Sequence, residues 1–394
     1  MKNSYFILGC IAILSIASCE KSIVAGPMED EVLDGQLEGL SYEENIQFLK
    51  GDNGFAEVFT IDKGVGPLFV ANSCISCHAG DGKGHPFTTL TRFGQIDNTG
   101  NLFLDMGGPQ LQNRAIPGYD PEQIPAGATF AKFTPPINTG LGFLDAITDA
   151  DIIAMSDPND LDGDGISGIP NWGELPSFAI PRPNSVTQGT TYIHRFGKKA
   201  AAYDLLHQTV NAYNQDMGVT SSFDPIDTHS GLEIDPEVSN NTVNDVVFYL
   251  KTLKAPIQRN AVDVISGENI FTQIQCASCH IPTLRTGYSS IDALSNKEFH
   301  PFTDLLLHDM GSELDDGYTE GSATTAEWRT PPLWGLGLAP DAQGGEYFLM
   351  HDGRAKSIEA AILLHAGEAS NSKSQYEGLS TTEKEALITF LESL

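Results

Sequence analysis

The sequence predicts a mainly α-helical fold of two tandem units with long loops, and three observations support this prediction. A Cys-x-x-Cys-His pentad occurs at residues 74–78 and again at residues 276–280. In both places the motifs "DMG" and "TPP" follow at similar distances, which is the mark of a duplicated unit. The 39 glycines and 22 prolines among 394 residues are typical of short helices joined by long connections.

Residues 1–18 are predicted to be a signal peptide. A lysine precedes an apolar run, residues 5–17, that is too short to span a bilayer and ends in small residues. The letters "IASC" fit a lipobox, in which cleavage before Cys19 leaves a lipid-carrying N-terminus. An ordinary cleaved signal is the alternative. We therefore expect a lipid-anchored protein in the cell envelope of a Gram-negative-type bacterium, periplasmic or associated with the outer membrane.

Two later segments carry clear helical periodicity. Residues 241–256, "NTVNDVVFYLKTLKAP", are predicted to form a helix that ends at Pro256. Residues 380–394 are predicted to form another helix, which a capping box of Ser380 and Glu383 opens.

These helices suggest where the units begin and end. Residues 19–54 are acidic with little periodicity, so we expect a tether from the lipid to the first unit. The two units are predicted to span residues 55–255 and 256–394.

The pentads admit three kinds of site: a dithiol redox centre, a zinc site, or covalent attachment of c-type haem. A dithiol centre needs no histidine after the second cysteine, and zinc needs four ligands gathered in one place. Haem c uses both features, since two thioethers tether the porphyrin and the adjacent histidine binds the iron. We therefore predict two covalently bound haems, one in each of two cytochrome c-like units. The attachment residues are Cys74, Cys77 and His78 for the first haem and Cys276, Cys279 and His280 for the second.

The formal net charge of −30 excludes nucleic acid and anionic lipid surfaces as partners, because both would repel the protein. Membrane contact is therefore expected only through the lipid anchor. The acidity suits basic redox partners or metal ions, and an ordinary solvated surface accounts for it equally well.

Residues 160–171, "DLDGDGISGIPN", follow most of the calcium-loop pattern. Gly165 occupies the sharp-turn position, whereas the last position lacks the bidentate glutamate. An acidic surface turn is the alternative. The predicted calcium ligands are Asp160, Asp162, Asp164, the carbonyl of Ile166, and Asn171.

Residues from about 55 to 394 resemble the diheme c-type oxidoreductases, a family also labelled peroxidases or thiol oxidoreductases and distantly related to bacterial diheme cytochrome c peroxidase. The resemblance rests on "TPPINTGLGFLDAI", "DPNDLDGDGISGIPN", "TDLLLHDMG", "EWRTPPLWGLG" and "HDGRAKSIEAAILLHAGEA". It implies that one haem transfers electrons through two axial ligands, while the other keeps an open site where peroxide reacts. It also implies a calcium ion between the two domains.

The resemblance also assigns the axial ligands of the haems. In the relatives, the distal ligand of the second haem lies fourteen residues after the histidine of the "HDG" motif, so His365 here pairs with His280. The repeat places Ala150 or Asp151 opposite His365, and neither is a usual haem ligand. The first haem is therefore expected to keep a vacant or water-filled distal face.

The relatives use a distal glutamate to move the proton, and the repeat brings Asp145 to that place. We therefore assign Asp145 as the candidate catalytic acid, with a helix-surface carboxylate as the alternative. His308, His351 and Arg354 are expected to line the pocket of the second haem or to hold its propionates. Lys198 stands where family members commonly carry a tryptophan, so a different electron route is expected.

The expected function is reduction of hydrogen peroxide at the first haem. Electrons from a donor cytochrome or another redox protein would enter through the second haem. The alternative is a non-catalytic electron-transfer cytochrome, and a weaker one is a haem or redox sensor of the envelope. A carrier needs neither a vacant site nor a distal acid, so these two features favour an enzyme.

Overall fold

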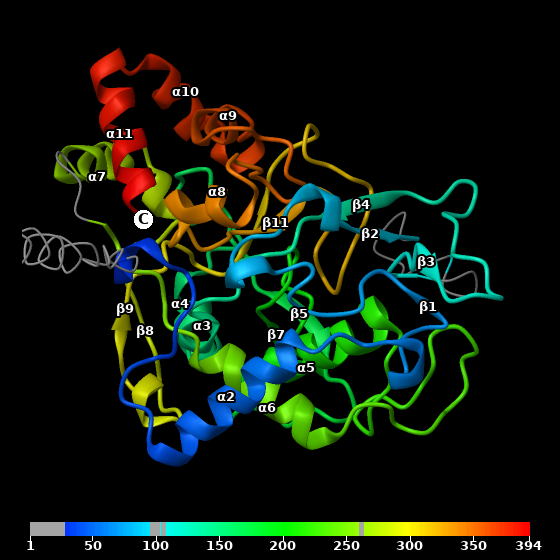
Figure 1. Cartoon of the computed structure of the whole chain (residues 1–394). Coiled ribbons are helices and arrows are strands. Elements are labelled where there is room, and N and C mark those ends of the chain that lie inside the picture. The colour runs from blue at the N-terminus through cyan, green and yellow to red at the C-terminus, as the bar shows by residue number, and fades with distance from the viewer. Residues whose placement is uncertain (1–27, 95–102, 104–107, 260–263) are drawn as a thin grey trace, which may run out of the picture.

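The computed structural model describes residues 28–94, 103, 108–259 and 264–394 (Figure 1). It is mainly helical with short strands, which confirms the predicted fold class at that level. The predicted signal peptide and Cys19 lie outside the described residues. Within the described part of the chain, no helix is long and apolar enough to cross a membrane.

The helices are short and spread along the chain. They are α2 (Tyr42–Ala56), α3 (Leu141–Asp145), α4 (Asp149–Met155), α5 (Leu205–Asn211), α6 (Asn240–Thr252), α7 (Val264–Gln273), α8 (Ala339–Ala342), α9 (Ile358–Leu363), α10 (Ser370–Gly378) and α11 (Thr381–Ser393). A π-helical turn, Ala212–Asp216, extends α5.

The strands form small antiparallel sheets between the helices. The pairs are β1 (Leu68–Phe69) with β3 (Arg114–Ala115), β2 (Leu90–Phe93) with β4 (Phe130–Phe133), β8 (Leu284–Arg285) with β9 (Glu298–Phe299), and β10 (Leu307–Asp309) with β11 (Glu327–Arg329). A three-stranded sheet has the order β5 (Asn171–Glu174), β7 (Thr191–His194), β6 (Thr187–Gln188).

Helix α2 corrects the predicted tether. Its N-cap, Ser41, accepts a hydrogen bond from the backbone of Glu44 in a capping box, so the helix begins inside the segment predicted to be unstructured. The segment folds because Phe48 and Phe55 leave solvent and join the main apolar core with α6. Lys50, Asp52 and two glycines between these two positions hide this sparse apolar face in the sequence.

Helix α2 approaches α6 closely at a glycine. A Cβ atom at Gly51 would collide with the backbone carbonyl oxygen of Asp245 on α6, so only glycine allows this contact. The predicted helix 241–256 is confirmed as α6, although it ends at Thr252. It ends early because Lys254 donates its backbone N–H to the carbonyl of Gly35 instead of to a carbonyl of the helix.

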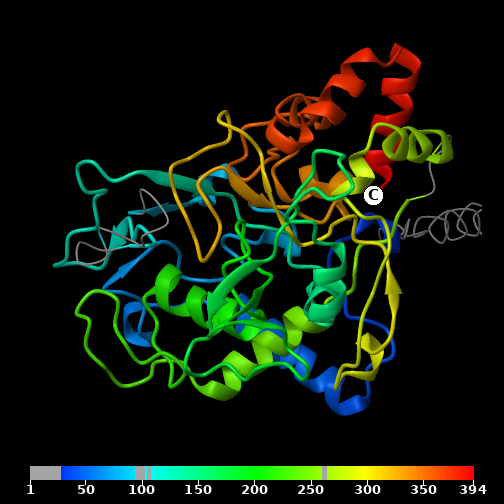
Figure 2. The same cartoon turned by 180° about the vertical axis from the view of Figure 1, so that it is seen from behind.

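Helices α7 and α11 repeat this arrangement at the opposite end of the molecule (Figures 1 and 2). A Cβ atom at Gly267 on α7 would collide with the backbone carbonyl oxygen of Ala386 on α11. The predicted capping box of Ser380 and Glu383 opens α11 and is confirmed. In each half, therefore, the helix that precedes a pentad packs through a glycine on the last helix of that half.

The two halves interleave instead of meeting at a simple boundary. The largest apolar core contains residues from both sides of position 256, and Phe143 stacks on Phe299 with ring centroids 5.2 Å apart. Side chains also tie the halves together by polar contacts. These are Arg92 Nε with Glu320 Oε1 at 2.6 Å, Gln343 Nε2 donating to the Gly84 carbonyl at 2.8 Å, and Thr134 Oγ1 donating to the His351 carbonyl at 2.9 Å.

Replacement of Gly51 or Gly267 by alanine tests the two helix contacts. Either change should lower the free energy of unfolding by about 1–3 kcal/mol, because the added methyl group forces the helix backbones apart. Thermal denaturation followed by circular dichroism measures the effect. Gly378→Ala is the matched control: a Cβ there meets no atom within 4 Å, so its effect should stay within about 0.5 kcal/mol. Equal stability of all three variants would contradict the packing described.

Candidate functional site

Both pentads open onto one cavity of ≈ 500 Å³ between the two helix pairs. The wall is mostly apolar and comes from both halves of the chain. Apolar wall residues include Phe55, Phe133, Leu144, Leu205, Phe271 and Trp334. Concave apolar sites with a few polar groups are typical of cofactor pockets.

The first pentad folds as a tight turn that presents its histidine to the cavity. The Cys74 carbonyl accepts the backbone N–H groups of Cys77 (3.1 Å) and His78 (3.0 Å). Phe55, at the end of α2, lies beside His78 with ring centroids 6.3 Å apart. Burial lowers the pKa of His78 to about 4, so its imidazole is neutral and can donate a lone pair to a metal.

The second pentad repeats this geometry. The Cys276 carbonyl accepts the backbone N–H of His280 at 3.0 Å, and Phe271 on α7 lies beside His280 with ring centroids 6.5 Å apart. The His280 Nδ1–H donates to the carbonyl of Phe302 at 3.0 Å, which leaves the lone pair on Nε2. Burial lowers the pKa of His280 to about 4. Both histidines therefore have the protonation state of iron ligands.

The four thiols suit neither a dithiol redox centre nor a zinc site. Burial raises the pKa of Cys74 and of Cys276 to about 12 and that of Cys77 to about 11, whereas a reactive dithiol needs a lowered pKa. In the described part of the chain, the pentad cysteines are not gathered into a four-ligand zinc set. The paired thiols and neutral histidines on an apolar wall fit covalently attached haem.

The structure brings His365 to the same cavity wall as His280. His365 follows α9, and its Nδ1–H donates to the carbonyl of Ala361 at 2.8 Å, so Nε2 is the free ring nitrogen. Burial lowers the pKa of His365. The pKa of His280 is also lowered, partly by the nearby His365. The predicted pair of ligands therefore shares one site with both rings neutral.

His308 lines the cavity as expected, but it is occupied by hydrogen bonds on both ring nitrogens. Nε2 bonds to Asp304 at 2.8 Å and Nδ1 to Glu368 at 2.7 Å. Burial opposes the charged form, yet these carboxylates raise the pKa of His308 to about 12. A doubly bonded, charged imidazole has no lone pair for iron. Glu368 also accepts hydrogen bonds from the backbone and hydroxyl of Ser167, so it links the predicted calcium loop to this pocket.

His351 and Arg354 both contact Asp316, but only His351 lines the cavity. His351 lines the cavity, stacks on Trp328 with ring centroids 3.7 Å apart, and bonds through Nε2 to Asp316 at 2.9 Å. Arg354 does not belong to the wall, which corrects its predicted role. Its Nε donates to Asp352 at 2.7 Å, and these contacts hold the guanidinium at the surface.

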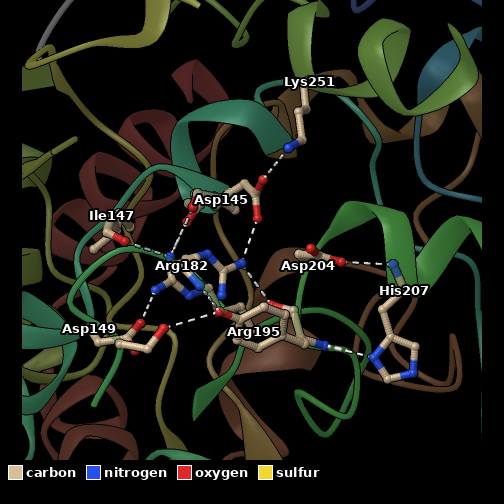
Figure 3. A network of polar contacts seen from close by, with 11 residues as sticks. Asp145, Ile147, Asp149, Arg182, Arg195, Asp204, His207 and Lys251 are labelled. Atoms are coloured by element: carbon tan, nitrogen blue, oxygen red, sulfur yellow. Dashed lines mark hydrogen bonds and ion pairs between the residues drawn. The ribbon is translucent and has the colours of Figure 1, made fainter. Parts of the chain in front are cut away.

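The predicted catalytic role of Asp145 is also corrected, because its carboxylate lies in an ion-pair network outside the cavity wall (Figure 3). It bonds to Arg182 Nη2 at 2.7 Å and to Lys251 Nζ at 2.9 Å. Burial alone would raise the pKa of Asp145, but Lys251 and Arg182 lower it well below its usual range. A carboxylate held by two cations cannot exchange protons near neutral pH. Its role is to fix α3 against α6.

A second ion pair in this network is fully buried. Arg195 bonds to Asp149, and it also donates to the carbonyl of Asp145, the last residue of α3, and to that of Ile147 (Figure 3). These contacts satisfy the end of a short helix that lies directly behind the cavity wall. The network therefore supports the cavity without entering it.

Ala150 and Asp151, which the repeat places opposite His365, do not line the cavity. The Asp151 carboxylate instead accepts a hydrogen bond from Thr148 at 2.6 Å at the start of α4. Neither residue can therefore reach a haem on His78.

Several wall residues have no role in the sequence-based prediction of the site. Asp216 lines the cavity, and its charge contributes to the raised pKa of both Cys74 and Cys77, so it lies beside the first pentad. Burial raises the pKa of Asp216 to about 7, although Arg92 opposes the shift. Other wall residues without a predicted site role include the cations Lys83, Lys198 and Arg329 and the methionines Met217, Met310 and Met350.

The predicted calcium loop forms a local acidic cluster. The carboxylates of Asp157, Asp160 and Asp162 all lie within 4.8 Å of one another. Asp164 accepts the backbone N–H of Ile166 at 2.9 Å, which tightens the loop.

Asn171 is not part of this cluster, which corrects its predicted role. Its side chain is fully buried at the start of β5, donates to the Lys199 and Glu320 carbonyls, and accepts the backbone N–H of Ser322. Its amide is thus committed to the interior. Asp157, three residues before the predicted loop, is the carboxylate that the sequence analysis missed.

Comparison with known proteins identifies the family. No curated protein matches the sequence significantly. Among solved structures, Kuenenia stuttgartiensis hydrazine synthase pressurised with 20 bar xenon is similar, with 12% identity, a TM-score of 0.42, and coverage of 96% of this chain and 98% of that chain. A MauG-like protein associated with microbial copper homeostasis has 14% identity, a TM-score of 0.30, and coverage of 64% and 90%. Residues 131–394 match the family model described as "Di-haem oxidoreductase, putative peroxidase", so the chain belongs to this family of di-haem oxidoreductases.

Proposed function

We propose that the protein is an exported c-type di-haem oxidoreductase that reduces hydrogen peroxide at the haem of the first pentad. One observation carries the proposal. Both pentads open onto a single cavity, and within the described residues His365 lies on its wall and contributes to the lowered pKa of His280, whereas no histidine contributes to that of His78. A site with two ligands suits electron transfer, whereas a site with one ligand leaves room for a substrate.

The chain's own residues hold the two haems. Cys74 and Cys77 would form the thioethers of the first haem, and Cys276 and Cys279 those of the second. His78 and His280 would bind iron from the proximal side, each as a neutral imidazole. When bound, the haems supply the one-electron chemistry that amino acid side chains lack.

Reduction of one hydrogen peroxide molecule to two waters consumes two electrons and two protons. The protein must therefore deliver protons into a cavity with a mostly apolar wall. Asp216 is the carboxyl group that suits this task, because it lines the cavity beside Cys74 and Cys77 and burial raises its pKa to about 7. Such a group takes up a proton and gives it back near neutral pH. Asp216 therefore replaces Asp145 as the candidate acid-base residue.

A non-catalytic electron carrier is the second candidate, and a specific observation favours it. Within the described residues, Met217, Met310 and Met350 line the cavity. A methionine thioether is a common axial ligand of electron-transfer haems. If one of them bound the first haem, both haems would be saturated and peroxide could not react.

Cell-envelope location and partners complete the proposal. We propose that Cys19 carries lipid and anchors the protein in the envelope. There its acidic surface would bind a soluble electron donor. The donor would be a cytochrome or another redox protein. The net charge of −30 supports a partner with a basic docking face.

Calcium is proposed for the acidic cluster. Asp157, Asp160 and Asp162 offer carboxylate oxygens close enough to share one ion, and calcium prefers such ligands. Because Glu368 bonds to Ser167 in the same loop, a bound ion would also steady the wall near the second pentad.

Ligand binding to the holoprotein separates the enzyme from the carrier. The enzyme should show a high-spin component in its optical spectrum, should bind cyanide at one haem only, and should consume hydrogen peroxide when given electrons. Both the oxidised and the half-reduced protein must be measured, since an axial ligand can leave when the other haem is reduced. Two low-spin haems that bind no cyanide in either form would establish the carrier.

Replacement of His365 by alanine tests its role as a ligand. The second haem should change from low-spin to high-spin, while both haems remain covalently attached. Optical and electron paramagnetic resonance spectra measure the change. His229→Ala serves as the control, because His229 is exposed and does not line the cavity. A His365→Ala spectrum that matches the wild type would remove His365 from the iron.

Asp216→Asn and Asp145→Asn should have different effects. Loss of the cavity carboxyl should slow peroxide turnover by about 10²- to 10⁴-fold with little effect on stability. Loss of the Asp145 charge leaves Arg182 and Lys251 partly unpaired and should mainly lower the thermal midpoint. Steady-state kinetics and thermal denaturation distinguish the two. Normal turnover in Asp216→Asn would exclude it as the acid-base residue.

Asp162→Ala should lower the thermal midpoint in the presence of calcium, because an ion that binds only the folded state stabilises it by RT ln(1 + [L]/Kd). Chelation should reduce the wild type to the level of the variant. Asp120→Ala is the control, since Asp120 is exposed and lies outside the acidic cluster. Melting curves of the wild type that coincide with and without calcium would disprove the metal site.

A further inference from the structure

Three cationic side chains meet on the cavity wall without a carboxylate partner. They are Lys83, Lys198 and Arg329, and in the described part of the chain none of them forms an ion pair. The fourth cation of the wall, Arg92, differs because Glu320 neutralises it at 2.6 Å. The cavity wall therefore holds three basic groups that no ion pair neutralises, inside a protein whose net charge is −30.

The backbone holds two of these cations next to each other. The Arg329 backbone N–H donates to the Lys198 carbonyl at 3.0 Å, and the Arg329 Nε–H donates to the Gly197 carbonyl at 2.9 Å. Gly197 has a φ of +91°, so the turn that presents Lys198 depends on a glycine. Arg329 and Lys198 are thus fixed as a pair at the end of β11.

Lys83 joins this pair from the loop that follows the first pentad. Its Nζ makes one long hydrogen bond, 3.4 Å, to the carbonyl of Met350. Its charge and that of Arg329 contribute, after burial, to a pKa of Lys198 well below its usual range. The three cations are therefore close enough to repel one another.

The nearest carboxylates cannot relieve this repulsion, because each is already engaged. Asp352 is bonded to Arg354 at 2.7 Å, and Asp304 is bonded to His308 at 2.8 Å. A buried cation without an anion is costly, and proteins normally pair such charges. By contrast the adjacent Lys199 is satisfied, since its Nζ donates to the carbonyls of Thr324, Thr325 and Glu327.

We propose that Lys83, Lys198 and Arg329 form a carboxylate-binding cradle that holds the propionates of the first haem. The inference rests on the haem attachment proposed above. Lysine and arginine form charge-assisted hydrogen bonds with carboxylates, and a haem on His78 would bring two of them into this cavity. Lys83 lies five residues after His78, and the charge of Lys198 contributes to the lowered pKa of His78, so the cradle lies near the first pentad. A free carboxylate ligand is the other source of the same chemistry.

Removal of a cradle charge should lower the reduction potential of the first haem. An unneutralised propionate stabilises the oxidised, more positive haem, so Lys198→Met and Arg329→Met should each shift the midpoint downward and leave the second haem unchanged. Optical redox titration of the holoprotein measures both midpoints. Lys198→Arg should keep the wild-type midpoint of the first haem because it keeps the charge. Lys50→Met, which removes an exposed lysine, is the matched control and should change neither midpoint.

Two further outcomes decide the source of the carboxylate and the validity of the cradle. If acetate shifts the midpoint of the wild type but not that of Lys198→Met, the cradle binds a free carboxylate and the propionate assignment falls. If both midpoints stay unchanged in Lys198→Met and in Arg329→Met, the cradle itself is disproved. Should Lys198→Met fail to fold, Lys198→Gln removes the charge while keeping a polar side chain.

Failure of the proposed function would look different. A wild-type protein without covalently bound haem in its pyridine haemochrome spectrum would overturn the attachment on which the cradle rests. A di-haem protein that ignores peroxide, but whose first midpoint falls in Lys198→Met, would overturn the peroxidase proposal and leave the cradle intact.

Discussion

The backbone-to-backbone approach of paired helices at Gly51 and Gly267 is the constraint on which the cavity depends. It brings α2 onto α6 and α7 onto α11 closely enough that their facing side chains form walls behind the two pentads. Phe55 and Phe271 then lie beside His78 and His280 at nearly equal distances, 6.3 and 6.5 Å between ring centroids. The repeat in the sequence thus corresponds to a repeat in the structure, because the same kind of helix pair lies beside each pentad at the one cavity.

Electrostatics divides the site into parts with different roles. The carboxylate assigned as catalytic from the sequence is structural, since Arg182 and Lys251 hold Asp145 behind the wall. The groups that face the cavity include the neutral histidines of the two pentads, three cations without an ion pair, and Asp216, whose pKa is raised. Burial without a partner therefore distinguishes the candidate functional residues here more clearly than membership of a motif does.

The sequence predicted those features that depend on local order, and it failed where distant contacts decide. The pentads, α6 and the capping box of α11 follow from spacing and periodicity, and the family resemblance predicts the shared wall of His280 and His365. The predicted roles of Asp145, Asn171 and Arg354 are wrong, because contacts with Lys251, Ser322 and Asp352 hold their side chains elsewhere in the fold. Asp216 and Lys83 lie outside the quoted motifs, and Arg329 lies in a motif that gives it no role, so only the folded chain shows that they meet at the cavity. Helix α2 was missed because its apolar face is interrupted by charged residues.

The interleaving of the halves has a consequence for how the protein matures. Gln343 bonds to Gly84, His351 to Thr134 and Glu320 to Arg92, so the walls around the first pentad include residues that the ribosome adds more than two hundred positions later. If the chain leaves the cytoplasm N-terminus first, the first pentad emerges while much of its pocket does not yet exist. Thioether formation at Cys74 and Cys77 would then take place on an open segment, and closure of the walls would follow as the last step of assembly.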